Sequence, residues 1–324
     1  MSLGTRTFLI TGALGAVGVW TTRSLLERGH RVVAFDLGGD GHRMPLALDR
    51  DQMSTVTRVD GDITDLASVE SAIRDHAVDG VIHLAALQVP FVRDNPPLGA
   101  QVNVSGTVNV FEAVRRHGLP GPLVYASSIA VYGPANSLSG DDQPQTLYGV
   151  FKRTNEATAH RYFEDLGVSS IGLRPHTVYG PGRDQGITSA PTAALLAAAA
   201  RIPYRIAFGG RIQMQYAPDV GEAFARAALL SYEGASVHNL DGEVAAVADL
   251  PALILRALPE AAGLITVDET PLPLVASVDG ESFVELLGGS VMRPVADGVR
   301  DALAQFEQHL ASGLIMPPSP TSGI

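Results

Sequence analysis

Tyr148 and Lys152 stand four residues apart in a segment, residues 148–166, whose pattern predicts a long helix, so both side chains are expected on one helix face. An ammonium close to a phenol favours the phenolate and lowers its pKa, as a tyrosine general base requires. Lysine also offers a compact ammonium that can hydrogen-bond the ribose of a nicotinamide cofactor, where a forked guanidinium would fit poorly. The pair therefore predicts proton abstraction beside a bound dinucleotide.

Lys152 is the single lysine among 23 basic residues, the other 22 being arginine. A coding bias accounts for arginine wherever any surface cation will serve, which makes the one exception informative. The exception suggests that arginine cannot take the role of this lysine. The alternative is that a lysine on a solvated helix face was retained by chance. Twenty residues before Tyr148, Ser127 and Ser128 follow a predicted strand, where a hydroxyl could orient a substrate oxygen.

A glycine-rich segment, Gly12-x-x-Gly15-x-x-Gly18, stands where a first strand gives way to a first helix. Glycine permits the tight turn, lets backbone N–H groups approach a pyrophosphate and lets the helix lie close to the sheet. The anion would then rest at the positive end of the helix. This strand–turn–helix context predicts a dinucleotide site.

Asp36 ends the second predicted strand, 18 residues after the last glycine. A carboxylate there can accept hydrogen bonds from both adenosine ribose hydroxyls and would repel a 2′-phosphate, which favours NAD. A turn residue at a strand end is the alternative, and Arg43 nearby could accommodate the phosphate of NADP. Asp62 follows the third strand, suitably placed for the adenine, although such an aspartate is more often a capping or turn residue.

Strand-like and helix-like segments alternate through the first half of the chain. Short apolar, β-branched runs predict strands at residues 6–11, 31–35, 55–59, 80–84, 123–126 and 168–173. Helical patterns lie between them at residues 16–28, 66–76, 98–117 and 148–166. The alternation predicts an α/β fold, a Rossmann-like doubly wound parallel sheet with helices on both faces. Continuously apolar strands agree with burial on both sides.

Beyond Pro175 the alternation loosens into a smaller α+β lobe. Helices are expected near residues 190–200, 220–230, 249–258 and 295–311, with strand-like pieces at residues 204–208 and 237–240. We therefore expect an NAD-binding Rossmann domain over residues 1–175 and a mainly substrate-binding lobe, interleaved with the sheet, over residues 176–315. The Pro/Ser-rich tail over residues 316–324 is expected to be disordered.

The composition excludes several classes of protein. A net charge of −11 leaves no basic surface for nucleic acid or anionic lipid. The absence of cysteine excludes disulfides and thiolate chemistry, and the nine histidines form no HExxH or HxxxH pair, so no metal site is expected. No apolar run reaches membrane-spanning length and no charged leader with a cleavage site precedes the first strand. We expect a cytoplasmic protein with no membrane partner.

Together these motifs resemble those of the extended short-chain dehydrogenases/reductases, in particular the NAD-dependent sugar epimerase/dehydratase family. The matching pieces are TGALGAVG (11–18), Asp36, DIT (62–64), HLAA (83–86), NVSGT (103–107), SSIAVYG (127–133), YGVFK (148–152) and LRPHTVYGPG (173–182). They cover roughly the first 180 residues, with weaker similarity near YAPDV (216–220). The set is specific to the superfamily but not to one reaction.

The resemblance implies that Tyr148 is the acid/base, that Lys152 holds the ribose and tunes Tyr148, and that Ser128 binds the reacting oxygen. Asn103 would position the lysine or a proton-relay water, a plain polar helix residue being the alternative. The implied NAD-binding residues are Gly12, Leu14, Gly15, Ala16, Val17, Gly18, Asp36, Asp62, Ile63, Leu84, Ala85, Ala86, Asn103, Tyr148, Lys152, Pro175 and His176. The substrate is expected to contact Gln88, Ser128, Ile129, His176 and Arg183.

Two histidines in these motifs have competing interpretations. His83 is expected to be a satisfied core histidine rather than a catalyst, and His176 stands evenly between a site residue and a packing residue. The family commonly pairs its subunits through two long helices from each, here residues 98–117 and 148–166, which predicts a homodimer. Val102, Val110 and Val114 give the first helix an apolar stripe for this purpose, although the stripe could equally face the sheet.

Departures from the family pattern bear on the reaction. Sugar dehydratases place Asp-Glu directly after the active-site hydroxyl residue, because elimination of water needs its own acid and base. This chain has Ile129 and Ala130 there, so dehydration is not expected.

Nucleotide-sugar epimerases usually hold the substrate pyrophosphate with two arginines and an asparagine. The corresponding positions here are Ile212, Ala276 and Thr177, with Arg211 or Arg205 as possible replacements for the first arginine. The loss of all three groups favours a smaller substrate.

The predicted function is therefore NAD-dependent hydride transfer at a carbohydrate carbinol, with a sugar or sugar-acid dehydrogenase favoured. Arg183 is the candidate for binding a substrate carboxylate, because its forked guanidinium can hold one bidentately; a solvated loop cation is the alternative. An NAD-dependent nucleotide-sugar epimerase is the alternative activity. A non-catalytic NAD sensor would have no reason to keep the Tyr–Lys pair.

Overall fold

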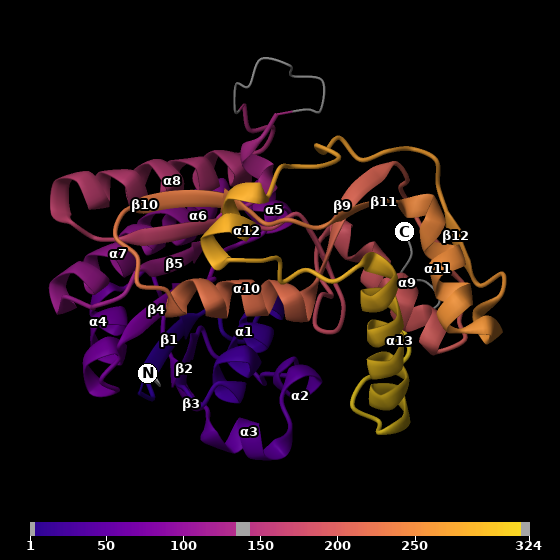
Figure 1. The fold of residues 1–324 in the computed structure, drawn as a ribbon, viewed down its shortest axis with the longest axis horizontal. Coiled ribbons are helices and arrows are strands. Elements are labelled where there is room, and N and C mark those ends of the chain that lie inside the picture. Colours follow the sequence, from indigo (N-terminus) through magenta and orange to yellow (C-terminus); the bar gives the residue numbers. More distant parts are fainter. Residues whose placement is uncertain (1–3, 134–142, 319–324) are drawn as a thin grey trace.

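A seven-stranded parallel sheet forms the larger body of the molecule, in a computed structural model that describes residues 4–133 and 143–318 (Figure 1). The strand order is β10-β6-β5-β4-β1-β2-β3, and every neighbouring pair is parallel. The strands are β1 (Thr7–Thr11), β2 (Arg31–Asp36), β3 (Thr57–Asp60), β4 (Gly80–His83), β5 (Leu123–Ala126), β6 (Ser170–Arg174) and β10 (Ala235–Asn239). The predicted doubly wound α/β sheet is confirmed.

Alternate side chains of the central strands enter apolar cores on opposite faces of the sheet. Phe8 and Ile10 of β1 face one core, which α1 (Ala16–Glu27) and α10 (Ala217–Leu229) cover. Leu9 faces the other core, which α4 (Leu66–Asp75), α7 (Gly106–His117) and α8 (Leu147–Leu166) cover. With both faces covered by helices, the strand ends are where a dinucleotide can reach the sheet.

The strand order reverses between β1 and β4, which lie side by side in the centre of the sheet. From β1 the chain proceeds outward to β2 and β3, whereas β4 returns to the opposite side of β1 and continues to β5 and β6. The loops that follow β1 and β4 therefore diverge to opposite faces and leave a crevice between them. Dinucleotides bind at such switch points in this class of fold.

The helix expected over residues 98–117 is divided in the structure. It consists of α6 (Pro96–Ala100), one π-helical turn, η1 (Gln101–Ser105), and α7, with a further short helix, α5 (Val89–Asp94), before it. A π turn leaves backbone carbonyls outside the regular ladder, so that side chains can bind them, and such turns are frequent at functional sites. Periodicity cannot separate one π turn from an α-helix, which is why the interruption was not predicted.

The apolar stripe expected on this helix faces the sheet. Val110 and Val114 are buried in the core between α7 and the strands, and Val102 lies against the same core. The exposed apolar side chains in this region come from neighbouring segments instead, among them Leu98, Leu147 and Val150. The predicted homodimer stays a prediction.

The smaller lobe contains two small sheets and three helices. One sheet has the order β11-β9-β7, from β7 (Thr177–Tyr179), β9 (Arg211–Tyr216) and β11 (Glu243–Ala246), and the other pairs β8 (Tyr204–Ile206) with β12 (Ile265–Val267). Around them lie α9 (Ala190–Ala199), α11 (Leu250–Ala257) and α13 (Val295–Ala311). Figure 1 shows this lobe to the right of the main body.

The chain passes between the two bodies more than once. It leaves the main sheet after β6 at Pro175, and later returns to it with α10, β10 and α12 (Glu281–Leu287), whose Phe283 and Leu287 enter the core beside β10. The strand expected at residues 237–240 is thus the seventh strand of the main sheet, because its parallel pairing with β6 continues the sheet edge. The division expected at residue 175 stays a prediction.

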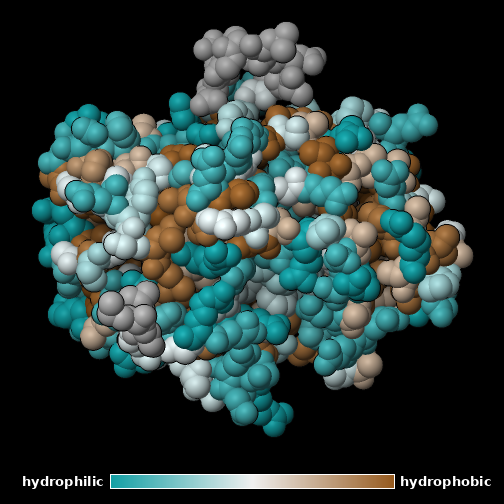
Figure 2. All heavy atoms as spheres, in the orientation of Figure 1, coloured by the Kyte–Doolittle hydropathy of each residue, from teal (hydrophilic) through white to brown (hydrophobic). Residues whose placement is uncertain are grey.

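Between β2 and β3 lie two short helices, α2 (Met44–Ala47) and α3 (Arg50–Thr55). The predicted disordered tail at residues 316–324 lies largely outside the described residues. In the described part of the chain no helix is long and apolar enough to cross a membrane. On the face shown in Figure 2, hydrophilic residues predominate and hydrophobic ones are interspersed among them.

Candidate active site

Tyr148 lies in the first turn of α8, whose start is fixed by the Thr146 side chain, which accepts a hydrogen bond from the Gly149 backbone N–H (3.1 Å). This turn lies directly against the backbone that follows Ser128, since a Cβ on Gly149 would stand 2.1 Å from the Ala130 carbonyl oxygen. The absence of a side chain at Gly149 permits this approach. Tyr148 consequently forms a hydrogen bond with Ser128.

Lys152 follows Tyr148 by one helical turn, and its side chain is 4% exposed. Its Nζ donates to the Ala126 carbonyl at 2.6 Å and lies 5.6 Å from the centre of the Tyr148 ring. Burial lowers the pKa of Lys152 to about 8, although the charge of Glu156 acts in the opposite direction. The predicted Tyr–Lys pair is thus assembled on one helix face next to the end of β5.

The phenol of Tyr148 is half-buried, and burial raises its pKa above the ordinary value. The hydrogen bond with Ser128 and the positive charge of Arg183 act against burial and lower that pKa. A general base of this kind needs such stabilisation of its anionic form. The expected tuning of Tyr148 by Lys152 stays a prediction.

Asn103 occupies the middle of the π turn and is buried. Its side chain brackets Leu87, accepting from the Leu87 backbone N–H at 2.7 Å and donating to the Leu87 carbonyl at 2.9 Å. The backbone carbonyl of Asn103 accepts hydrogen bonds from Asn155 Nδ2 (2.8 Å) and Thr107 Oγ1 (2.7 Å). In this structure Asn103 therefore holds the loop after β4, and its expected contact with the lysine or a relay water stays a prediction.

The backbone of the loops after β1 and β4 offers groups at which the diphosphate of a dinucleotide would bind. Gly12 has a φ of +71°, and a Cβ there would stand 2.6 Å from the Ala85 backbone nitrogen, so the two loops touch through backbone alone. Gly15 precedes α1 without any side-chain cap, and no acidic residue lies in the first turn, which contains Ala16 and Val17. The N–H groups of that turn remain for an anion.

Asp36 lies at the end of β2, beside the loop after β1. Its carboxylate accepts hydrogen bonds from the backbone N–H groups of Leu14 and Leu37, both at 2.9 Å. Arg43, the possible partner of a 2′-phosphate, forms an ion pair with Asp184 at 2.8 Å and also donates to the Leu14 carbonyl at 3.4 Å. These residues fit NAD, because a carboxylate at the end of β2 stands where this class of fold binds the adenosine ribose and the nearby guanidinium is already paired.

Further positions predicted to bind the cofactor follow β3 and β4, and their contact with NAD stays a prediction. Asp62 accepts a hydrogen bond from the Thr64 backbone N–H at 2.8 Å, as expected of a turn residue, and Ile63 is buried against α7. Leu84, Ala85 and Ala86 form the loop that directly follows β4. His83 contacts Thr11 Oγ1 (2.7 Å) and Thr107 Oγ1 (3.0 Å) inside the sheet. The prediction of a satisfied core histidine is confirmed.

Arg183 approaches Tyr148 from the loop after β7. It donates to Gln88 Oε1 (3.3 Å), Thr188 Oγ1 (3.1 Å) and the Gln185 carbonyl. Burial lowers the pKa of this guanidinium, with the charges of Tyr148 and Asp184 acting in the opposite direction. Among the described residues no carboxylate lies within ion-pair distance of it. The structure thus brings together Gln88 and Arg183, two of the residues expected to contact the substrate, beside Tyr148.

His176 lies where the chain passes from the main sheet into the smaller lobe. Its backbone N–H donates to Gln215 Oε1 (2.7 Å), and its Nε2 donates to the Val275 carbonyl (2.8 Å). The ring therefore joins the two bodies, and its proximity to nicotinamide or substrate stays a prediction. Ile129 is buried in a 3-10 turn, η2 (Ile129–Val131), that follows Ser128.

The positions of the missing pyrophosphate clamp have other roles. Ile212 is 2% exposed within the core of the smaller lobe, and Thr177 is buried with its hydroxyl 3.1 Å from His176 Nδ1. Arg205 forms an ion pair with Asp268 at 2.6 Å on the exposed surface.

Sequence reasoning missed two residues of this arrangement. Gly149 allows the approach of α8 to the Ser128 turn, and a glycine in the first turn of a predicted helix was the available signal. Glu156, one further turn beyond Lys152, is a buried carboxylate with several partners. Its i, i+4 spacing from the lysine was visible, but its burial was not.

A doubly wound parallel sheet with a glycine-rich turn after β1 and a Tyr–Lys pair beside the end of β5 is the arrangement of an NAD-dependent enzyme. A family model described as the NAD dependent epimerase/dehydratase family matches residues 8–238, and the chain belongs to this family.

Individual relatives agree with this assignment. UDP-glucuronate 4-epimerase 2 of Arabidopsis thaliana is 35% identical over 182 residues, which are 53% of this chain and 42% of that protein. The chain thus spans less than half the length of this relative. The UDP-glucose 4-epimerase of Thermus thermophilus, solved with NAD, is 25% identical with a TM-score of 0.77 over 93% of this chain and 98% of that chain. An L-threonine dehydrogenase from Clostridium difficile, at 23% identity and a TM-score of 0.77 over 94% and 98%, shares the fold.

Proposed function

We propose that the protein is an NAD-dependent dehydrogenase of a sugar acid that carries no nucleotide. When bound, NAD supplies the hydride acceptor. Tyr148 would remove the proton of the substrate hydroxyl while the hydride leaves the same carbon, so that the carbinol becomes a carbonyl. Ser128 would hold the reacting oxygen through the hydroxyl that contacts Tyr148, and Lys152 would hold the ribose and stabilise the phenolate.

The observation that carries the substrate class is the environment of Arg183. Its guanidinium lies at the reacting tyrosine, is half-buried, and has neutral oxygen acceptors as its hydrogen-bond partners. A cation removed from water without an anion is unfavourable, and a bidentate carboxylate would relieve that cost. A substrate with a carboxylate near its reacting carbon supplies this anion, which supports a uronic or aldonic acid.

The absence of a nucleotide follows from the charge that a diphosphate would bring. Ile212, Thr177 and Ala276 occupy the three positions at which the family usually neutralises a pyrophosphate. Ile212 and Thr177 are buried, and Arg205 is engaged by Asp268. Arg211 is the one proposed replacement left, and burying two phosphate charges beside a single cation would cost more free energy than the hydrogen bonds of the sugar supply.

An epimerase acting on a nucleotide sugar is the second candidate, and the similarity to UDP-glucuronate 4-epimerase 2 favours it. It would use the same Tyr148 chemistry twice, with the carbonyl intermediate turning between the two hydride transfers. The two activities differ in whether NADH accumulates and in whether a nucleotide binds.

The test begins with the purified protein, NAD and a panel of aldonic acids, uronic acids and the matching neutral sugars. NADH absorbance should rise with at least one acid. Arg183→Gln should raise KM for that acid about 100-fold, as expected for loss of a charged bidentate pair, and leave KM for neutral sugars unchanged. Arg205→Gln is the matched control, because Arg205 is exposed and paired on the surface of the smaller lobe.

Calorimetry separates the two candidates. UDP, UDP-glucose and dTDP-glucose should show no binding at low millimolar concentration, where the acid does bind. Micromolar affinity for any of these nucleotides, or tightly retained NAD with no net reduction, would replace the dehydrogenase with the epimerase.

A further inference from the structure

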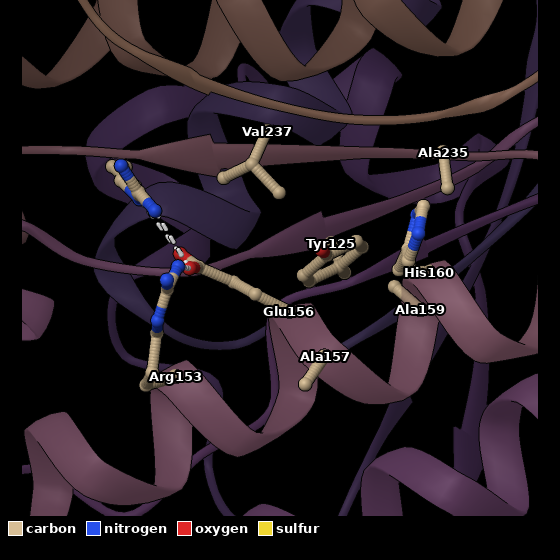
Figure 3. A pocket seen from close by; sticks show the side chains of 9 residues that line it. Tyr125, Arg153, Glu156, Ala157, Ala159, His160, Ala235 and Val237 are labelled. Carbon is tan, nitrogen blue, oxygen red and sulfur yellow. Dashed lines mark hydrogen bonds and ion pairs between the residues drawn. The ribbon is translucent and has the colours of Figure 1, made fainter. Parts of the chain in front are cut away.

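A cavity of about 300 Å³ lies between α8 and the edge strand β10 (Figure 3). Small side chains on both sides leave this space, namely Ala157 and Ala159 on α8 and Ala235 on β10. The hydroxyl of Tyr125 reaches its wall from β5, buried and without a hydrogen-bond partner among the described residues. Glu156 projects from α8 into the same space.

The carboxylate of Glu156 joins three elements of the active site. It accepts from Ser127 Oγ at 2.5 Å, at the end of β5. It also accepts two hydrogen bonds from the guanidinium of Arg174, both at 2.7 Å, at the end of β6. Ser127 directly precedes Ser128, and Arg174 directly precedes Pro175. One buried side chain on the helix of Tyr148 therefore fixes both strand ends that approach the reaction.

Glu156 also stands one helical turn beyond Lys152. Burial raises the pKa of the Glu156 carboxyl, but the hydrogen bond and charge of Arg174, together with the hydrogen bonds from Ser127 and Arg153, outweigh burial and hold that pKa below its ordinary value. The carboxylate consequently stays ionised, and its charge raises the pKa of Lys152 against the effect of burial. The other titratable or charged groups around these two residues are Tyr148, Arg153 and His160 of α8, Tyr125 of β5, Arg174 of β6 and His83 of β4.

We propose that Glu156 is a positioning residue of the hydride-transfer site, holding the strand ends before Ser128 and Pro175 and supplying the negative charge that keeps Lys152 an ammonium. The role in turnover rests on the function proposed above. The effect on Lys152 does not, since it can be measured without any substrate.

The single lysine of the chain makes that measurement direct. Protein labelled with ¹³C-lysine gives the side-chain signals of Lys152 alone, and their shift with pH reports its titration. We expect a midpoint of about 8 in the unaltered protein. Glu156→Gln should lower it by about 0.5 unit or more, because the isosteric amide removes the charge. An unchanged midpoint in folded Glu156→Gln protein would overturn the proposal.

Two control variants isolate the carboxylate. Glu164→Gln removes an exposed charge from the same helix, and Tyr125→Phe removes an unpartnered hydroxyl from the same cavity. Both variants should leave the midpoint of the Lys152 titration unchanged. A shift in either control as large as that of Glu156→Gln would show a general effect of altering this region and would also overturn the proposal.

Kinetics and chemical rescue complete the test. Glu156→Gln should lower kcat about tenfold or more and leave KM for the acid within about threefold, since the substrate contacts are retained. Glu156→Ala opens the cavity further, so added formate should restore the Lys152 midpoint and part of kcat. No rescue of either quantity in folded protein would count against a positioning charge. If no sugar acid is oxidised by the unaltered protein, the proposed function fails while the lysine titration still decides the role of Glu156.

Discussion

Gly149→Ala adds one methyl group, which should raise the helix propensity of α8 but clash with the turn after Ser128. In an exposed helix, alanine in place of glycine stabilises by about 1 kcal/mol. In this protein the new Cβ would stand 2.1 Å from the Ala130 carbonyl oxygen and 2.9 Å from the Pro144 side chain, whereas ordinary contact begins near 3.4 Å. The ordinary contact distance of 3.4 Å exceeds the distance of 2.1 Å to the Ala130 oxygen by about 1.3 Å. The start of α8 and the turn after Ser128 must therefore move apart by about that much.

That separation has a cost in stability and a larger one in turnover. Forcing an extra methyl group into a packed contact costs about 1–3 kcal/mol, which exceeds the gain in helix propensity. A displacement of about 1 Å between catalytic groups costs roughly 100-fold in rate, and here the displaced pair is Tyr148 and Ser128. We expect lower stability together with a kcat reduced about 100-fold.

Thermal unfolding and NADH formation with the best sugar acid measure the two quantities on the same preparations. Gly121→Ala is the control, because a Cβ there meets nothing nearer than 4.0 Å. A Gly149→Ala protein with an unchanged or higher Tm and more than a third of the original kcat would refute the reasoning, since α8 would then not need its glycine.

Four further predictions concern the cofactor site, the core and the surface. Lys152→Arg should retain less than about a tenth of kcat in folded protein, and a higher value would show that any cation serves. NAD should bind at least about tenfold more tightly than NADP, and Asp36→Asn should reduce this ratio of dissociation constants. Tighter binding of NADP than of NAD to the unaltered protein would contradict the prediction. Burial lowers the pKa of His83 to about 3, so the unfolded chain binds a proton there more readily and stability should fall as pH drops from about 6.5 toward 3. His83→Asn should reduce the slope of the unfolding free energy against pH by up to about 1.4 kcal/mol per pH unit. If chemical denaturation gives the same slope for the variant, His83 is not the cause of the pH dependence. Light scattering at micromolar concentration should give the mass of a dimer for the unaltered protein and of a monomer for Val150→Asp, since Val150 lies next to exposed Leu147. A monomeric mass for the unaltered protein would contradict the predicted dimer.

The local chemistry of the chain was largely predictable from sequence. Buried strands, helix periodicity and the Gly12 turn depend on neighbouring residues, so they are visible in the order of amino acids. The i, i+4 spacing of Tyr148 and Lys152 likewise places both on one face of any helix that contains them. The same reasoning predicted that His83 would be a core residue, because it stands at the end of an apolar strand.

Contacts between distant segments were decided by the tertiary structure. Whether Val110 and Val114 face the sheet or a partner depends on how α7 is rotated against the strands, and the periodicity of the helix is the same in both cases. The pairing of β10 with β6 and the meeting of Arg183 with Tyr148 join residues separated by long stretches of chain. Sequence by itself determined which groups could do chemistry here, because their spacing is local; their burial, partners and charge state were set by folding, because those depend on what packs around each group.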